Sequence, residues 1–194
     1  MPNVLPMGTR EWGLLAALSL LWGGSFLFAG IAVRELGPFT VVLARVLLAG
    51  VVLVLVAMAR RIVVAARARD WRDYAIMALF NNVVPFTLIF WALQHIETGL
   101  AAIFNATTPF FTVVLAQSLT DDEKINPGKV AGVVLGMTGV ALLIGLPALR
   151  GAAHEVAPSL ACVGAAVSYA LASIWARRFR DKPALAPATG QLVM

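Results

Sequence analysis

Long apolar stretches alternate with short polar connections along most of this chain. Six of them are long enough to cross the hydrocarbon core of a bilayer as a helix, which takes about 20 apolar residues. They cover residues 14–33, 39–59, 74–94, 99–119, 130–146 and 158–176. Five contain no Lys, Arg, Asp or Glu, and the second contains one charged residue, Arg45. Because barrel strands alternate polar and apolar residues, the pattern predicts an all-α integral membrane protein with six transmembrane helices.

The first stretch has an alternative interpretation as the apolar core of a secretory signal peptide. It is longer than the usual core of about 7–15 residues, and no small-x-small cleavage motif follows it. Composition supports the membrane class, with 60% hydrophobic and 13% charged residues against about 25% charged in soluble domains. One cysteine, Cys162, excludes a disulfide scaffold. The basic residues lie in short clusters between apolar runs, so we expect no nucleic-acid binding.

The distribution of Lys and Arg predicts the orientation of the chain. One set of connections, which includes the N-terminus, residues 60–72 and residues 177–182, carries 12 of them, and the opposite set carries 2. Since cytoplasmic connections are enriched in Lys and Arg, we expect a multi-pass protein of the inner or plasma membrane with a cytoplasmic N-terminus. The connections on the other side at 35–38 and 95–98 are short, which predicts tight antiparallel hairpins.

A short internal similarity links the first and sixth spans at one offset of 143 residues. The matched pairs are Ser25 with Ser168, Phe26 with Tyr169, Ala29 with Ala172, and Arg34 with Arg177. A five-helix unit reverses direction when repeated, which gives the inverted-topology repeat of many secondary transporters. We expect a cytoplasmic segment 1–13, a first repeat 14–146, and a second repeat that begins within 147–194. Residues 181–194 resemble a loop leading into a seventh span, so we interpret the chain as the N-terminal portion of a longer protein.

Arg45 is the strongest single candidate for a functional residue. An Arg inside the hydrocarbon is costly and either pairs within the bundle or faces a cavity. The alternative is that its side chain extends to the interface, with the charged group in the headgroup region.

Two spans combine amide side chains with proline. In the third, Asn81 and Asn82 precede Pro85, and proline removes the helix bond to the Asn81 carbonyl. The fourth carries a polar stripe at helical spacing, Asn105, Thr108, Pro109 and Thr112. Interrupted helices near mid-membrane indicate a central binding site, whereas the alternative is that these amides only bond neighbouring helices.

Aromatic and hydroxyl side chains from two further spans are expected to complete this site. They are Trp22, Ser25 and Phe26 from the first span and Tyr169 from the sixth. The fifth span instead has small residues on one face, and we expect it to pack against another helix or form a homodimer there. These residues are Gly132, Gly136 and Gly139.

The spans contain no carboxylate, and no histidine or cysteine has a second ligand at metal-site spacing. We therefore expect no catalytic residues, metal or cofactor, and an enzyme is disfavoured.

The sequence resembles the EamA-type branch of the drug/metabolite transporter superfamily. The resemblance lies in LLWGGSFLFAGIAVRELGP, in Arg45 within LARVLLAG, and in residues 92–145 with their TP pair and the acidic turn 121–124. It implies ten helices in two inverted repeats around a central cavity. Members often carry a Gly-Glu pair where this chain has Asp121-Asp122-Glu123-Lys124.

We therefore expect a secondary transporter of small metabolites that works by alternating access. The guanidinium of Arg45, in spans that contain no Asp or Glu, favours neutral, zwitterionic or anionic solutes over organic cations. The alternative is a transport-incompetent fragment, or a membrane subunit that assembles through its glycine-rich fifth helix.

Overall fold

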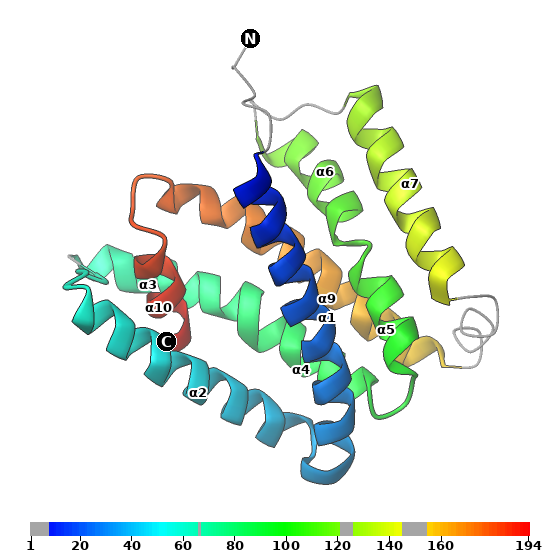
Figure 1. The fold of residues 1–194 in the computed structure, drawn as a ribbon, viewed down its shortest axis with the longest axis horizontal. Coiled ribbons are helices and arrows are strands. Elements are labelled where there is room, and N and C mark those ends of the chain that lie inside the picture. The colour runs from blue at the N-terminus through cyan, green and yellow to red at the C-terminus, as the bar shows by residue number, and fades with distance from the viewer. Residues whose placement is uncertain (1–7, 66, 121–125, 145–154) are drawn as a thin grey trace.

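The computed structural model describes residues 8–65, 67–120, 126–144 and 155–194, and this part of the chain is helical without strands (Figure 1). The α-helices are α1 (Thr9–Leu36), α2 (Pro38–Ala59), α3 (Ala68–Ala78), α4 (Val84–Ala92), α5 (Thr98–Asn105), α6 (Thr108–Leu119), α7 (Pro127–Ile144), α9 (Val156–Trp175) and α10 (Leu185–Val193). A π-helix, η1 (Leu79–Val83), joins α3 to α4, and a 3-10 helix, η2 (Ala176–Phe179), follows α9.

Five predicted spans correspond to segments of membrane-crossing length and hydropathy in the described residues. These segments are Thr9–Leu36, Pro38–Ala59, Ala68–Ala92, Thr98–Leu119 and Val156–Phe179. The fifth predicted span, 130–146, corresponds to α7, which is not among these segments; the last two residues of that prediction lie outside the described part. The acidic turn 121–124 also lies outside it. The all-α membrane fold is confirmed.

The third helix begins earlier than hydropathy predicts. Asp70 caps it, because its Oδ2 accepts the Arg67 backbone N–H at 3.1 Å. Two more turns of helix therefore precede Tyr74, and they include the carboxylates of Asp70 and Asp73. The helix therefore includes two carboxylates that lie before the predicted span 74–94, because a capped polar turn extends an apolar helix beyond its hydropathy boundary.

The α1–α2 connection is a tight hairpin, as its length predicts. Gly37 is the single residue between the helices, with φ 75° and ψ 157°, a conformation that is essentially restricted to glycine. Its N–H donates to the Val33 carbonyl at 3.2 Å, and its carbonyl accepts the Val41 N–H at 3.2 Å. Pro38 then starts α2 with the φ that a first helical turn requires.

Helix α9 lies at the centre of the bundle, against α4, α5 and α6 (Figure 1). Its inward face is built from small residues, among them Ala165, Ala166 and Ala170, which are fully buried. Small side chains let helix backbones approach closely, which is the main source of packing energy between helices in a membrane. A buried apolar cluster joins this face to residues of α1, α4 and α5.

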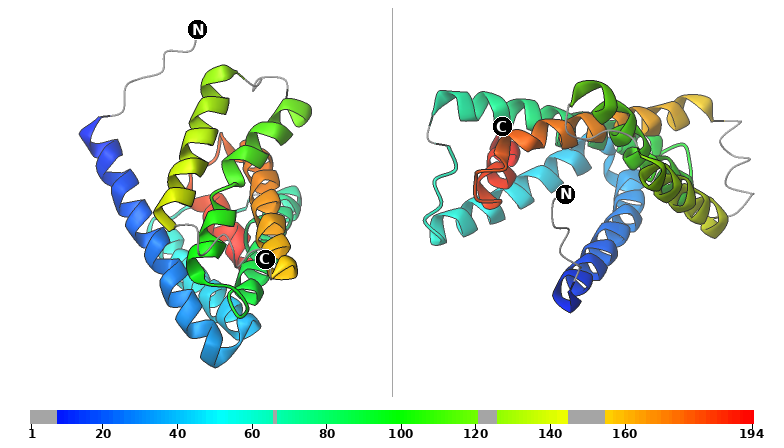
Figure 2. Two further views of the ribbon diagram at one scale, coloured as in Figure 1. Left: turned by 90° about the vertical axis from the view of Figure 1, so that its right-hand side faces the viewer. Right: turned by 90° about the horizontal axis from the view of Figure 1, so that it is seen from above.

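Helix α1 is packed only along its second half. Figure 2 shows its first half projecting away from the other helices, and Leu20 and Leu21 there are 78% and 74% exposed. Exposed leucines on a membrane-length helix are suited to contact with lipid or with further apolar chain. The divergence of α1 leaves an opening beside α2, η1, α4 and α9.

Candidate functional site

A cavity of about 330 Å³ lies where α1 diverges from the bundle, and we call it the Arg45 cavity. Its lining comes from five elements and consists of Leu18, Leu21, Trp22, Ser25, Arg45, Asn81, Phe86 and Tyr169. A smaller hollow of about 20 Å³ adjoins it and is bounded in part by Phe26. Six residues predicted from four different spans are thus brought together at one place.

The Arg45 side chain points into the bundle. Its Nη1 donates a hydrogen bond to Ser25 Oγ on α1, and its Cζ lies 4.8 Å from the centre of the Phe86 ring on α4. These contacts favour pairing within the bundle over extension to the interface. None of the residues lining the cavity is Asp or Glu, so the guanidinium has no anionic partner in the cavity wall.

The π-helix beside the cavity has a direct cause in Pro85. In this register the Val84 N–H donates to the Leu79 carbonyl, and the Phe80 carbonyl would next accept from residue 85, which as proline has no N–H. Ser168 Oγ on α9 donates to the Phe80 carbonyl at 2.8 Å instead. In an α-helix, Pro85 would leave the Asn81 carbonyl without a donor, as we expected. In the π-helix, the carbonyl left without a backbone donor is that of Phe80, one residue earlier.

The two amides of η1 bond to the same residue of α10. Asn81 Nδ2 donates to Gln191 Oε1 at 3.0 Å, and Asn82 Nδ2 donates to the Gln191 carbonyl at 3.3 Å. Asn82 and Pro85 are buried and do not line the Arg45 cavity. Of the three residues predicted for the site from the third span, only Asn81 lines it. Gln191 was missed, because the pattern placed residues 181–194 in a loop, whereas a helix begins at Leu185.

The predicted stripe of the fourth span lies away from the Arg45 cavity. The span is interrupted between α5 and α6, where Thr108 Oγ1 donates at 2.7 Å to the Asn105 carbonyl. That carbonyl would otherwise accept from Pro109, which has no N–H. Thr112 in turn donates to the Thr108 carbonyl at 2.9 Å. Asn105 Oδ1 is buried, with no hydrogen-bond partner in the described part of the protein.

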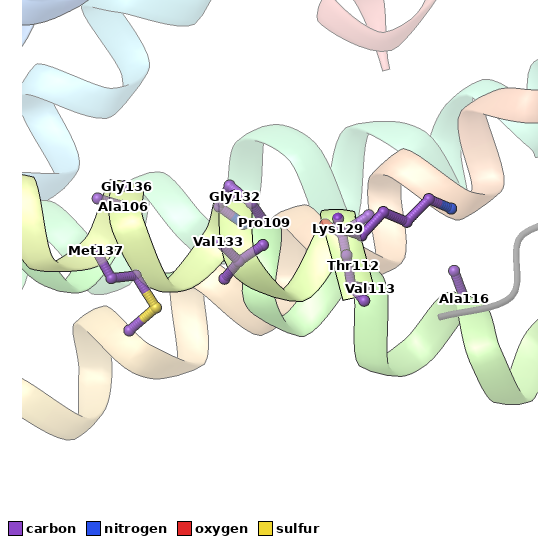
Figure 3. Close-up of a pocket in the computed structure, with 11 residues that line it drawn as sticks. Ala106, Pro109, Thr112, Val113, Ala116, Lys129, Gly132, Val133, Gly136 and Met137 are labelled. Carbon is purple, nitrogen blue, oxygen red and sulfur yellow. The ribbon is translucent and has the colours of Figure 1, made fainter. Parts of the chain in front are cut away.

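A second cavity, of about 570 Å³, lies between α6 and α7 (Figure 3). Pro109 and Thr112 line one side of it, and Gly132 and Gly136 line the other. A Cβ at Gly132, Gly136 or Gly139 would meet no atom within 4 Å. In the described residues these glycines are therefore not packed closely against a neighbouring helix, and the predicted helix-packing or homodimer contact through them stays a prediction.

The basic end of the bundle holds an ion pair between segments far apart in sequence. Lys182 Nζ lies 2.6 Å from Asp70 Oδ1 and donates to Tyr74 Oη at 3.3 Å. Burial lowers the pKa of the Lys182 ammonium, but hydrogen bonds from it to Asp70 and Tyr74 outweigh this effect and raise the pKa above its usual value. This contact holds the segment after α9 against α3.

Comparison with known proteins supports the class that the fold indicates. An uncharacterized transporter of Archaeoglobus fulgidus is 32% identical over 138 residues, which are 71% of this chain and 47% of that protein. The uncharacterized transporter YvbV of Bacillus subtilis is 30% identical over 173 residues, 88% of this chain and 54% of its own. The chain spans about half the length of these relatives.

A crystal structure shares the fold with a TM-score of 0.66 at 23% identity, and the match covers 90% of this chain and 61% of the other. Residues 11–145 match the EamA-like transporter family. That match includes α1 to α7 nearly in full, with Arg45 and the interrupted third and fourth spans. The chain belongs to the EamA-like transporter family.

Proposed function

We propose that this protein is a secondary transporter of small solutes and that the Arg45 cavity binds its substrate. The observation that carries the proposal is a guanidinium in the wall of a membrane cavity whose lining contains no carboxylate. An ionic group of this kind inside a membrane indicates a substrate pathway by default. Anionic and zwitterionic solutes are favoured, neutral ones are admitted, and organic cations are disfavoured.

The chemistry of the cavity supports this order of preference. A guanidinium carries five N–H donors in a planar fork that suits carboxylate and phosphate oxygens, and Ser25 accepts from one nitrogen. A cation bound at about 4 Å would be repelled by about 4 kcal/mol at an effective dielectric constant of 20. The rings of Trp22, Phe86 and Tyr169 supply apolar contact for the body of the solute.

Alternating access is part of the same proposal. The sequence similarity between α1 and α9 supports an inverted repeat, and such repeats rock against each other around a central site. Tyr169 on α9 lines the Arg45 cavity together with Trp22 and Ser25 on α1. Helices from both expected repeats thus contribute to one site. The excess of Arg on one set of connections supports an inner-membrane location with a cytoplasmic N-terminus.

Uptake into vesicles reconstituted with the complete protein tests this function. The probes are a labelled aromatic carboxylate, a zwitterionic aromatic amino acid and a lipophilic cation of similar size. We expect the first two to be transported in preference to the cation, and Arg45→Gln to abolish their uptake while helix content is unchanged. Arg34→Gln, which removes an Arg at the end of α1, is the matched control. Uptake of the anion and the zwitterion by Arg45→Gln at the original rate would refute the role of Arg45.

A further inference from the structure

Two basic segments that are far apart in the sequence meet at one end of the bundle. Trp175 Nε1 donates to the Asp73 carbonyl at 3.1 Å, and the Tyr74 and Phe179 rings lie 5.3 Å apart. With the Lys182–Asp70 ion pair, these contacts hold the start of α3, Ala68 to Tyr74, against residues 175–182. Figure 1 shows the start of α3 and the end of α9 at the same end of the molecule.

The side chains at this end present positive charge to their surroundings. In the sequence, residues 60–73 and 175–182 contain nine Lys and Arg against three Asp. Asp73 is buried at 7% exposure, and the Asp70 side chain is 17% exposed and paired with Lys182. The Arg69 and Arg72 side chains, in contrast, are 69% and 64% exposed, although each also lies near Asp73. Asp70 and Asp73 therefore lie inside and Asp181 is exposed, while the Arg69 and Arg72 guanidinium groups lie outside.

The orientation of one guanidinium is fixed by an aromatic ring. Arg178 Cζ lies 4.0 Å from the centre of the Trp175 ring, and the Arg178 side chain is exposed. A stacked guanidinium keeps its N–H donors at the edge of the plane, where they are available for bidentate bonds to phosphate. The Asp73 carbonyl accepts the Trp175 N–H. Arg72 precedes Asp73 in the chain and Arg178 stacks on the Trp175 ring, so each Arg lies beside one partner of this hydrogen bond.

We propose that Arg69, Arg72 and Arg178, with Trp71 and Trp175, form a binding site for the phosphate headgroup of an anionic phospholipid. The site lies at the ends of two membrane-length helices, Ala68–Ala92 and Val156–Phe179, which is the depth of lipid headgroups. Tryptophan is enriched at that depth, and Trp71 is 38% exposed there. Basic clusters directly beside a membrane span bind anionic lipids. This site is separate from the Arg45 cavity and does not depend on the transported solute.

Lipid binding to the whole chain in detergent micelles, measured by native mass spectrometry, tests the proposal. The probes are phosphatidylglycerol and phosphatidylcholine with identical acyl chains. We expect phosphatidylglycerol to bind more tightly, and each Arg→Gln change at positions 69, 72 and 178 to weaken its binding by about fivefold, the effect of one charge near an anionic surface. Arg34→Gln, at the opposite end of the bundle, is the control and should bind phosphatidylglycerol as the unchanged protein does.

Three outcomes would overturn the proposal. They are equal affinity for the two lipids, unchanged phosphatidylglycerol binding by the Arg69→Gln/Arg72→Gln/Arg178→Gln variant, or equal weakening by Arg34→Gln. Displacement of phosphatidylglycerol by inorganic phosphate at the same concentration would show a site for free phosphate instead of a lipid. Circular dichroism of each variant checks that helix content is retained. Arg178→Lys keeps the charge but not the planar fork, so we expect it to bind phosphatidylglycerol less tightly than the unchanged protein.

Discussion

Replacement of Gly190 by alanine tests how α10 is held against the rest of the protein. A Cβ at this position would collide with Tyr74 Cδ2 and would lie 2.6 Å from Cε2 and Cγ. Ordinary van der Waals contact begins at 3.4 Å, so either the ring or the helix must move. Tyr74 is fully buried, and its hydroxyl donates to the Val64 carbonyl at 2.7 Å. Because the ring is fixed at both ends, we expect α10 to move.

The expected cost of this substitution follows from these contacts. Overpacking of a tight site costs about 1–3 kcal/mol, and displacement of α10 also strains the two hydrogen bonds from Asn81 and Asn82 to Gln191. We therefore expect Gly190→Ala to lower the free energy of unfolding by about 1–3 kcal/mol or more. The measurement is thermal or denaturant unfolding of the protein in detergent micelles. Gly24→Ala is the matched control, since a Cβ there meets no atom within 4 Å and alanine favours helix.

A double-mutant cycle separates this collision from other effects of the substitution. In a Tyr74→Ala background the ring is absent, so Gly190→Ala should cost close to nothing. The same cost of Gly190→Ala with and without the ring, or an unchanged stability of Gly190→Ala alone, would refute the close packing of α10 on α3.

Three further changes test other parts of the fold. Ser168→Ala leaves the part-buried Phe80 carbonyl without its donor and should cost about 1 kcal/mol. Pro85→Ala restores a backbone N–H, so the cost of Ser168→Ala should fall in that background, and equal costs in an unfolding cycle would contradict the explanation of η1. The Lys182–Asp70 contact should stabilise the protein fully below the usual lysine pKa of 10.5, and this stabilisation should be lost as pH rises through the raised pKa of Lys182. Melting curves of Lys182→Met should lack this alkaline loss of stability, and a pH profile identical to that of the unchanged protein would argue against the ion pair. Gly37→Ala forces a side chain into a glycine conformation at a cost of about 1–3 kcal/mol, and an unchanged melting temperature would show that the α1–α2 turn is different.

The positions of the helices could be predicted closely, because a bilayer imposes a strong constraint on sequence. Backbone groups in hydrocarbon must be bonded internally, so each span is a long apolar segment that is helical along nearly all of its length. The start of α3 was predicted late for the same reason. Hydropathy ends at Tyr74, but the capped turn around Asp70 continues the helix into the polar region.

The candidate site was predictable only in part. Periodicity indicates which residues share a face of one helix, and the polar and aromatic residues selected from the sequence include Trp22, Ser25, Arg45, Asn81 and Tyr169 of the Arg45 cavity. Leu18 and Leu21, which also line it, were not predicted, because leucines in an apolar span do not stand out. Periodicity does not indicate which neighbour a helix face meets, so the stripe from Asn105 to Thr112 was assigned to the same site. Phe86 was missed because one phenylalanine in an apolar helix carries no distinguishing signal.

The two prolines have different consequences because their released carbonyls find different donors. In the fourth span the Asn105 carbonyl accepts from Thr108 of the same chain segment, so the break is satisfied locally. In the third span the Phe80 carbonyl accepts from Ser168 on α9, and the adjacent Asn81 is bonded to Gln191 on α10. Asn81 also lines the Arg45 cavity. A displacement of α9 or α10 relative to α4 must therefore break these hydrogen bonds or move η1 with it. If η1 moves, Asn81 moves with it, and the wall of the proposed substrate site changes.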